Sequence, residues 1–341
     1  MLSRYLNKFP DGYNPSTQQV NLIKKIEHAF NQGHKFVICS APTGSGKSFI
    51  SKTLANVSNE STDNFKELIE SYDAFKMDNV GNYTNEPECL DEPASGAFAL
   101  TITKTLQDQY YELFDDSIVM KGKSNYVSTL NPDIDVEMEK SIMPRKVLEE
   151  HRKAHKCNYH NDRNKGLVDK FGVLNYKMFL SLPNHVKRKN FIICDEASEL
   201  EDEIVKQYSV FIDPDRLKLL GVKVPSLYSE KHDAIYKWIC SCILEISEYI
   251  NTLTETWEEC EYVVQRDGKT ARVMPLKVDV LSKYIFKYAD KVLLMSATII
   301  DHKHFAKSLG IKQYEYVESD STFDPLKAPI YINTKQKINH Y

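Results

Sequence analysis

The segment APTGSGKS, residues 41–48, carries the residue types that hold the phosphates of a nucleotide. Its glycines let backbone N–H groups turn toward phosphate oxygens, and the N-terminus of a following helix adds partial positive charge. The segment fits the P-loop pattern, except that alanine replaces the first glycine. The nucleotide-binding residues predicted from it are Ala41, Pro42, Thr43, Gly44, Ser45, Gly46, Lys47 and Ser48.

Two residues of this loop have individual roles. Lys47 would reach the β- and γ-phosphates of ATP, and Ser48 would place its hydroxyl on Mg²⁺. An apolar run, FVICS, precedes the loop, and a pattern typical of a helix follows it. Because this strand–loop–helix context is present, we interpret the motif as a phosphate site. Kinases, GTPases and motors all use such loops, so the loop alone leaves the reaction open.

A pair of carboxylates follows another apolar run, in FIICDEA. Parallel α/β sheets bind ligands just beyond the carboxyl ends of their strands. There Asp195 would hold Mg²⁺, and Glu196 would orient and deprotonate the attacking water. An alternative is a helix N-cap with an acidic first turn. The P-loop in the same chain favours the catalytic interpretation, with Lys47 as the third catalytic residue.

Apolar periodicity predicts the elements that must position these residues. Buried strands are expected at residues 36–40, 97–103, 191–197 and 291–299. Helices are expected at residues 17–30, from about 47, at 106–114 and at 231–259, and a hairpin over 261–276. Continuously apolar strands that alternate with helices indicate a parallel sheet covered on both faces, and therefore an α/β fold.

The composition is that of a globular protein: 341 residues, 42% hydrophobic and 27% charged, with a net charge of −4. The charge gives no overall basic signature, so any nucleic-acid contact must come from a local patch. No run of 18 apolar residues and no signal peptide occurs, and no membrane partner is expected. The scattered cysteines are typical of reduced thiols. We therefore expect a cytoplasmic protein, bacterial or, if viral, in the host cytoplasm.

Five motifs taken in order, Gln19, APTGSGKS, LTITKTLQDQ, DEAS and SAT, resemble those of superfamily 2 helicases of the DEAD/DEAH-like kind. The stretches KGKSNYVS, GVLNYKMFL and STFDPLKAPIY are similar to the DinG and XPD family of DNA helicases. The resemblance covers nearly the whole chain. It implies a RecA-like P-loop NTPase lobe with helical insertions. The implied activity is an ATP-dependent DNA helicase or translocase, 5′ to 3′ by family habit, in DNA repair or replication.

The resemblance also assigns residues. It adds Gln19 to the nucleotide site, and Ser296 and Thr298 as residues that couple hydrolysis to movement. The residues that it implies for contact with single-stranded or forked DNA are Thr103, Lys104, Asn175 and Tyr176. For the stretch TITK, an ordinary polar strand end is an alternative to a DNA contact.

The family commonly holds an iron–sulfur cluster on four cysteines, but this chain departs from that pattern. Ser128 stands where the first ligand is expected, and Cys157 is the cysteine that remains in this window. One thiolate cannot hold a cluster that takes about four. We therefore expect ATP and Mg²⁺ as cofactors and no iron–sulfur cluster. A zinc site of His151, His155, Cys157 and His160 is an alternative, although a solvated basic helix explains the first two equally well.

The expected domain organisation follows the resemblance. The segments are 1–120 (first lobe, with an acidic insertion at 58–96), 121–165 (reduced iron–sulfur-domain remnant), 166–202 (first lobe, acidic pair), 203–260 (helical arch-like insertion), 261–325 (end of the first lobe) and 326–341 (start of a second lobe). We expect the second RecA-like lobe in the same gene or in a partner chain, and weak ATP hydrolysis by this chain alone. Two alternatives stay open: a DNA-stimulated ATPase that remodels protein–DNA complexes without unwinding, and a non-hydrolysing ATP-binding assembly module.

Overall fold

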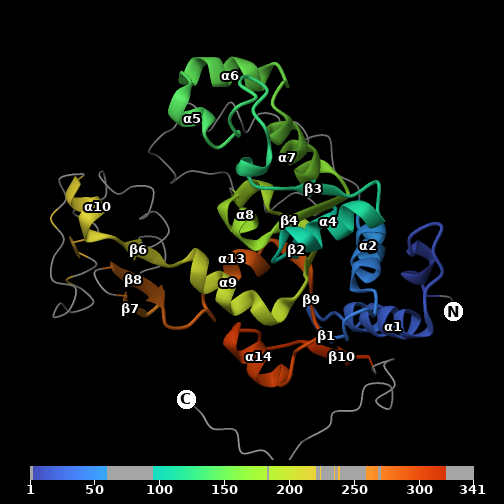
Figure 1. Cartoon of the computed structure of the whole chain (residues 1–341). Helices are drawn as coiled ribbons and strands as arrows, with labels where there is room; N and C mark the ends of the chain where they lie inside the picture. Colours follow the sequence, from blue (N-terminus) through green and yellow to red (C-terminus); the bar gives the residue numbers. More distant parts are fainter. Residues whose placement is uncertain are drawn as a thin grey trace, which may run out of the picture.

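The computed structural model describes residues 3–59, 95–182, 184–219, 259–267 and 270–319, with residues 223, 234, 237 and 238 between them. A 7-stranded sheet in the order β10-β1-β9-β5-β2-β4-β3 forms the centre of the described part (Figure 1). Every strand pair in it is parallel. The strands are β1 (Phe36–Ser40), β2 (Ala97–Thr101), β3 (Ile118–Met120), β4 (Phe171–Asn175), β5 (Lys189–Cys194), β9 (Ala289–Ser296) and β10 (Glu315–Glu318).

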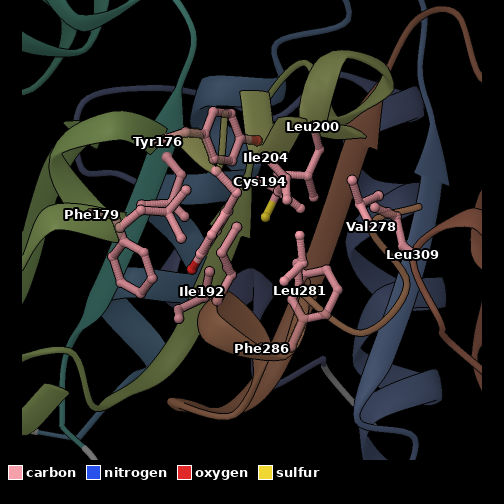
Figure 2. Packing of buried hydrophobic residues seen from close by; sticks show 14 of the residues in the cluster. Tyr176, Phe179, Ile192, Cys194, Leu200, Ile204, Val278, Leu281, Phe286 and Leu309 are labelled. Atoms are coloured by element: carbon pink, nitrogen blue, oxygen red, sulfur yellow. The ribbon is translucent and has the colours of Figure 1, made fainter. Parts of the chain in front are cut away.

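Helices cover both faces of this sheet. Successive side chains of a strand point to opposite faces, so the apolar strands present side chains for packing on each face. Val37 and Cys39 pack with α1 (Thr17–Asn31), α2 (Lys47–Val57) and α4 (Lys104–Leu113), whereas Ile38 packs toward the opposite face. The helices on that opposite face are α7 (Asn158–Val168), α8 (Tyr176–Ser181), α9 (Leu200–Gln207), α13 (Lys283–Phe286) and α14 (His302–Ser308). Figure 2 shows this second cluster, with Phe179, Ile192 and Leu200 among its labelled residues.

The predicted α/β class, with a parallel sheet covered by helices on both faces, is confirmed. Each of the four predicted strands is present, as β1, β2, β5 and β9. One strand, β9, lies between β1, which leads into the P-loop, and β5, which leads into the acidic pair. Because β1 and β5 are not neighbours, the loop and the carboxylates that follow them can face each other across the end of β9.

A second, 3-stranded sheet lies beside the main one in the order β6-β8-β7. Its strands are β6 (Val210–Ile212), β7 (Tyr262–Asp267) and β8 (Thr270–Pro275), and both pairings are antiparallel. The predicted hairpin is confirmed by the pairing of β7 with β8. The predicted helix at 231–259 lies outside the described residues, except for residues 234, 237, 238 and 259. Most of the acidic insertion, and all of residues 326–341, also lie outside them.

Residues 121–165 carry short helices that stand beside the main sheet, with α5 and α6 at the top of Figure 1. Val136, Cys157 and Tyr159 form a small apolar core there. The Ser128 hydroxyl accepts hydrogen bonds from the backbone N–H groups of Leu130 and Asn131, both at 3.1 Å. The Ser128 side chain therefore stabilises the turn at residues 128–131.

The short elements of the described chain are η1 (Leu6–Lys8), η3 (Lys123–Asn125), α5 (Glu139–Ile142), α6 (Arg145–Lys153), η4 (Asn184–Val186), η5 (Ala197–Glu199) and α10 (Pro214–Leu219).

Within the residues that the structure describes, helices that combine enough length and apolar character to cross a bilayer are absent.

Candidate nucleotide-binding site

The residues predicted to do chemistry meet at one edge of the main sheet. All strands are parallel, so their carboxyl ends lie on the same side. Ser40 at the end of β1 is paired with Ser296 at the end of β9. The backbone N–H of Asp195 donates to the carbonyl of Leu100 on β2 at 2.9 Å. The P-loop, the acidic pair and the SAT segment are therefore brought together in space, as the sequence predicts.

The P-loop turns at two glycines in the left-handed region. Gly44 has φ +81° and Gly46, the N-cap of α2, has φ +79°. The positive φ favours glycine at position 46, and a Cβ there would lie 2.1 Å from Nε2 of Gln19, so the end of the Gln19 side chain would have to move. The start of the loop is fixed to the sheet, because the N–H of Ala41 donates to the carbonyl of Ser296 at 3.0 Å.

Lys47 is the first residue of α2 and is largely buried. Its Nζ lies 3.4 Å from Oε1 of Glu196 and donates to the carbonyl of Ala41, also at 3.4 Å. The amine is thus folded over the loop toward the acidic pair. A lysine at this point can reach phosphate oxygens held in the loop without leaving α2.

The loop also contains an unsatisfied polar atom. Oγ of Ser45 is buried and has no hydrogen-bond partner among the described residues. A buried hydroxyl without a partner costs about 1–3 kcal/mol, so such a group in a native structure calls for an acceptor or donor from outside the protein. A phosphate oxygen at the loop would accept this hydrogen bond. The loop residues therefore fit a nucleotide phosphate.

Asp195 follows β5 and is 2% exposed. One carboxylate oxygen, Oδ1, accepts from the N–H of Glu196 at 3.1 Å, and Oδ2 accepts from the hydroxyl of Tyr110 at 3.1 Å. Burial, together with the negative charge of Glu196, raises the pKa of Asp195, while Lys47 opposes this shift. A divalent cation beside Asp195 would favour the ionised form. Mg²⁺ typically takes one or two carboxylates plus substrate phosphates, and Asp195 offers one such carboxylate.

Glu196 has a strained backbone. Its φ is +49° and its ψ +47°, the left-handed region that non-glycine residues rarely adopt. Such a residue costs on the order of 1–3 kcal/mol and persists where the surroundings require a particular side-chain direction. The Glu196 side chain is directed toward Lys47 and Ser296. The strain is thus located at the residue predicted to be the base.

The SAT segment joins the acidic pair through hydroxyl groups. Oγ of Ser296 lies 3.4 Å from Oε2 of Glu196 and 2.9 Å from Oγ of Ser198. The hydroxyl of Thr298 also contacts Ser198, at 2.9 Å. Sequence reasoning chose Ser296 and Thr298 but missed Ser198. The signal was present, since Ser198 is the last residue of the DEAS motif.

Gln19, predicted to belong to the nucleotide site, lies next to Gly46 of the P-loop. Its Nε2 is 3.5 Å from the Gly46 carbonyl, at the limit of a hydrogen bond. Its Oε1, however, accepts from the N–H of Ser16 at 2.9 Å, while the Ser16 hydroxyl accepts from the N–H of Gln19. The two residues form a capping box that starts α1. In this structure Gln19 therefore connects the start of α1 to the loop.

The residues predicted to contact DNA fall into two groups. Thr103 and Lys104 are exposed at the start of α4, where the Thr103 hydroxyl caps the helix by accepting from the N–H of Leu106. Asn175 is half-buried and caps α8 through its Oδ1. Tyr176 is 1% exposed within the apolar cluster of Figure 2, and its hydroxyl donates to the Asp195 carbonyl at 3.0 Å. Because its side chain is buried, Tyr176 has no exposed surface that could contact DNA. The hydrogen bond of its hydroxyl instead fixes the backbone at Asp195.

Two further side chains near Asp195 were missed. The buried hydroxyl of Tyr110, on α4, lies 2.9 Å from Oγ of Ser51, on α2. Ser51 stands four residues after Lys47, so helical spacing could have placed it on the same side of α2. Nothing in the sequence pattern links Tyr110 to Asp195.

The alternative zinc site is not assembled. Among the described residues, groups of three or more His, Cys, Asp or Glu side chains that could hold a metal ion are absent. Nε2 of His151 instead pairs with the hydroxyl of Thr129 at 2.8 Å, and His160 contacts the ring of Tyr159. Cys157 is buried, which raises the pKa of its thiol.

Comparison with solved structures finds XPD proteins. The chain is similar to a structure named "XPD_APO" with 13% identity and a TM-score of 0.45, over 87% of this chain and 57% of that one. It is similar to "XPD_Helicase" with 14% identity and a TM-score of 0.44, over 89% of this chain and 62% of that one. A third, "Truncated XPD", has 14% identity and a TM-score of 0.42, over 90% of this chain and 100% of that one.

The chain thus spans less than two thirds of the length of the first two structures. No protein-family model matches the chain, and no curated protein matches it.

Proposed function

We propose that this chain is the ATP-binding motor lobe of an ATP-dependent DNA helicase or translocase that moves 5′ to 3′ on single-stranded DNA. The observation that carries the proposal is the convergence of Lys47, Asp195 and Glu196 at one edge of a parallel sheet. A cation for phosphate, a buried carboxylate for a metal and a second carboxylate for water are the parts that ATP hydrolysis needs.

The roles divide among the residues as follows. The loop N–H groups and Ser45 would bind the phosphates, and Lys47 would leave Glu196 to contact the terminal phosphate. Ser48 and Asp195 would hold Mg²⁺, which when bound supplies charge neutralisation at the phosphates. Glu196, with its direction fixed by the left-handed backbone, would take the proton of the attacking water.

In this proposal DNA would lie along the same edge of the sheet. The strand order β1-β9-β5-β2 separates the end of β1 from that of β2 by three strand spacings, about 14 Å. Exposed Thr103 and Lys104 at the start of α4 would contact DNA phosphates there, as the helix N-terminus and its lysine favour anions. The hydroxyl network of Ser296, Thr298 and Ser198 would couple the state of Glu196 to the end of β9.

Two further parts belong to the proposal and rest on sequence resemblance. A second RecA-like lobe, from the same gene or a partner chain, would complete the nucleotide site. The region at residues 121–165 would act without an iron–sulfur cluster. The apolar contacts of Cys157 and the turn held by Ser128 support a protein-only core there.

Steady-state ATPase rates with and without single-stranded DNA, followed by a strand-displacement assay, test this function. We expect a Mg²⁺-dependent rate that DNA increases and that Lys47→Ala abolishes. Stimulation by DNA without strand displacement would favour the remodelling ATPase. ATP binding with a turnover equal to that of Lys47→Ala would favour the non-hydrolysing module and overturn the enzymatic proposal.

The DNA interface has its own test. Lys104→Ala should weaken binding of a fluorescent single-stranded oligonucleotide and reduce the salt slope of that affinity by about 1, because one phosphate contact is lost. Lys24→Ala, which removes an exposed lysine of α1, is the matched control. Equal affinities and slopes for the two variants would contradict the placement of DNA at α4.

A further inference from the structure

A buried chain of hydroxyl groups connects three elements around Asp195. Tyr110 is 0% exposed, and its hydroxyl contacts Oδ2 of Asp195 at 3.1 Å and Oγ of Ser51 at 2.9 Å. Ser51 belongs to α2, the helix that the P-loop begins, and Tyr110 to α4, the helix that Thr103 and Lys104 begin. These hydroxyl groups therefore connect both helices to Asp195, the carboxylate proposed to hold Mg²⁺.

The chemistry of these groups fixes the direction of the hydrogen bonds. An ionised carboxylate only accepts, so the Tyr110 hydroxyl must donate its single proton to Asp195. Ser51 must then donate to Tyr110. The other acceptor within reach of Ser51 is the Lys47 carbonyl, at 3.2 Å. The order is Ser51 to Tyr110 to Asp195, and Ser51 has a second acceptor should Tyr110 lose its hydroxyl.

We infer that Tyr110 is a positioning residue that orients Asp195 for Mg²⁺ and ties this carboxylate to helix α4. The inference rests on the proposed function, since it concerns the metal of that same site. With Oδ1 held by the N–H of Glu196 and Oδ2 by Tyr110, rotation of the carboxylate is restricted from both sides. Ligating carboxylates typically depend on such outer partners, whose removal costs about 10–100-fold in metal affinity or activity.

Helix α4 is held firmly enough for this task. The side-chain amide of Gln107 donates to the Met120 carbonyl at 3.2 Å, and the Ser117 hydroxyl donates to the Tyr110 carbonyl at 3.1 Å. The Tyr110 ring packs against Phe171 with centroids 5.9 Å apart. Both the backbone and the ring of Tyr110 are thus fixed without its hydroxyl, so Tyr110→Phe removes the contacts of this hydroxyl to Asp195, Ser51 and Ser48 and leaves the packing of the ring in place.

The test measures Mn²⁺ binding to the full chain in the presence of the non-hydrolysable nucleotide AMP-PNP. Binding is detected as the loss of the free Mn²⁺ signal in electron paramagnetic resonance. We expect Tyr110→Phe to bind Mn²⁺ about 10–100-fold more weakly than the unmodified protein. Ser51→Ala should weaken binding less, because the bond from Tyr110 to Asp195 stays. Tyr111→Phe, the same change at a neighbour that is 65% exposed, should bind as the unmodified protein does.

A second readout separates positioning from a general structural role. In ATPase assays, Tyr110→Phe should require more Mg²⁺ for half-maximal rate, and excess Mg²⁺ should restore kcat. Equal Mn²⁺ affinity of Tyr110→Phe and Tyr111→Phe would overturn the role of Tyr110, as would loss of the folded state in Tyr110→Phe. Failure of the unmodified protein to bind Mn²⁺ with AMP-PNP would overturn the proposed function itself.

Discussion

Nζ of Lys47 lies 3.4 Å from Oε1 of Glu196, so the loop cation and the candidate base are paired with each other across the site. Both side chains would have to change partners when a nucleotide binds. In the proposed function, phosphate would draw Lys47 away and so release Glu196 for a water molecule. The pair would then oppose nucleotide binding and keep the candidate base occupied until phosphate is present.

Substitution of Glu196 should slow hydrolysis without weakening ATP binding. Glu196→Gln removes the partner of Lys47, so ATP affinity should be unchanged or higher. Turnover should fall about 10²–10⁴-fold, the usual contribution of a general base. Titration with a fluorescent ATP analogue and steady-state ATPase measure the two effects. The control is Glu199→Gln, which removes the same charge from an exposed neighbour. Near-normal turnover in Glu196→Gln would contradict the assignment of the base.

Substitution of Lys47 should weaken ATP binding. The ammonium of Lys47 lies against the loop, 3.4 Å from the Ala41 carbonyl, and charge-assisted hydrogen bonds to a phosphate contribute about 1.5–3 kcal/mol each. Lys47→Ala should therefore weaken Mg-ATP binding on the order of 10- to 100-fold. Isothermal titration calorimetry measures this, with Lys24→Ala as an exposed control. Unchanged affinity in Lys47→Ala would mean that nucleotide binds elsewhere.

Two glycines of the loop should respond differently to alanine. Both have positive φ, so each substitution introduces similar backbone strain. A Cβ on Gly46 would meet Nε2 of Gln19 at 2.1 Å, whereas a Cβ on Gly44 has nothing within 4 Å. Without nucleotide, Gly46→Ala should therefore lower the melting temperature more than Gly44→Ala. Equal melting temperatures would show that Gln19 is not held against the loop in solution.

Lys189 should make the stability of the protein depend on pH. This lysine is 0% exposed at the start of β5, and its Nζ donates to the carbonyls of Leu167 and Asp169. Burial lowers its pKa to about 7, with partial opposition from Asp169. Above about pH 7 the unfolded chain therefore holds a proton that the folded chain lacks. The free energy of unfolding should rise with pH from about 7 toward the ordinary lysine pKa of 10.5, by at most about 1.4 kcal/mol per pH unit.

Urea unfolding at pH 7, 8 and 9 measures this dependence. Below pH 7 the lysine is protonated in both states, so it adds no slope there. Lys189→Met should show a smaller rise between pH 7 and 9 than the unmodified protein. Lys177→Met, at an exposed position of α8, should show the full rise. Identical slopes in all three proteins would contradict a buried neutral Lys189.

The purified protein should be colourless and free of iron. Cys157 is the one cysteine of residues 121–165, and it is buried against Val136 and Tyr159. Visible absorption and iron analysis of anaerobic preparations check this expectation. Cys157→Ala should leave ATP and DNA binding unchanged and should lower stability moderately, because a small buried side chain is lost. Stoichiometric iron with acid-labile sulfide would contradict it.

The sequence alone determined the parts of the site that are local. The predicted phosphate site of APTGSGKS uses consecutive residues of one loop, and the apolar runs before the loop and the acidic pair already mark strand ends. For this reason β1, the start of α2 and the hairpin of β7 with β8 agree with prediction. The capping box of Ser16 and Gln19 is local as well, and the helix start at residue 17 was predicted correctly.

Only the tertiary structure decided which distant residues meet. Tyr110 and Asp195 are 85 positions apart, and Ser296 and Glu196 are 100 apart. Their contacts depend on the strand order, which places β9 between β1 and β5. Tyr176 shows the same limit, because a tyrosine after a strand can face DNA or the core, and here it packs in the core. Periodicity reports which side of its own element a residue occupies, but the partner on that side is set by how the elements pack.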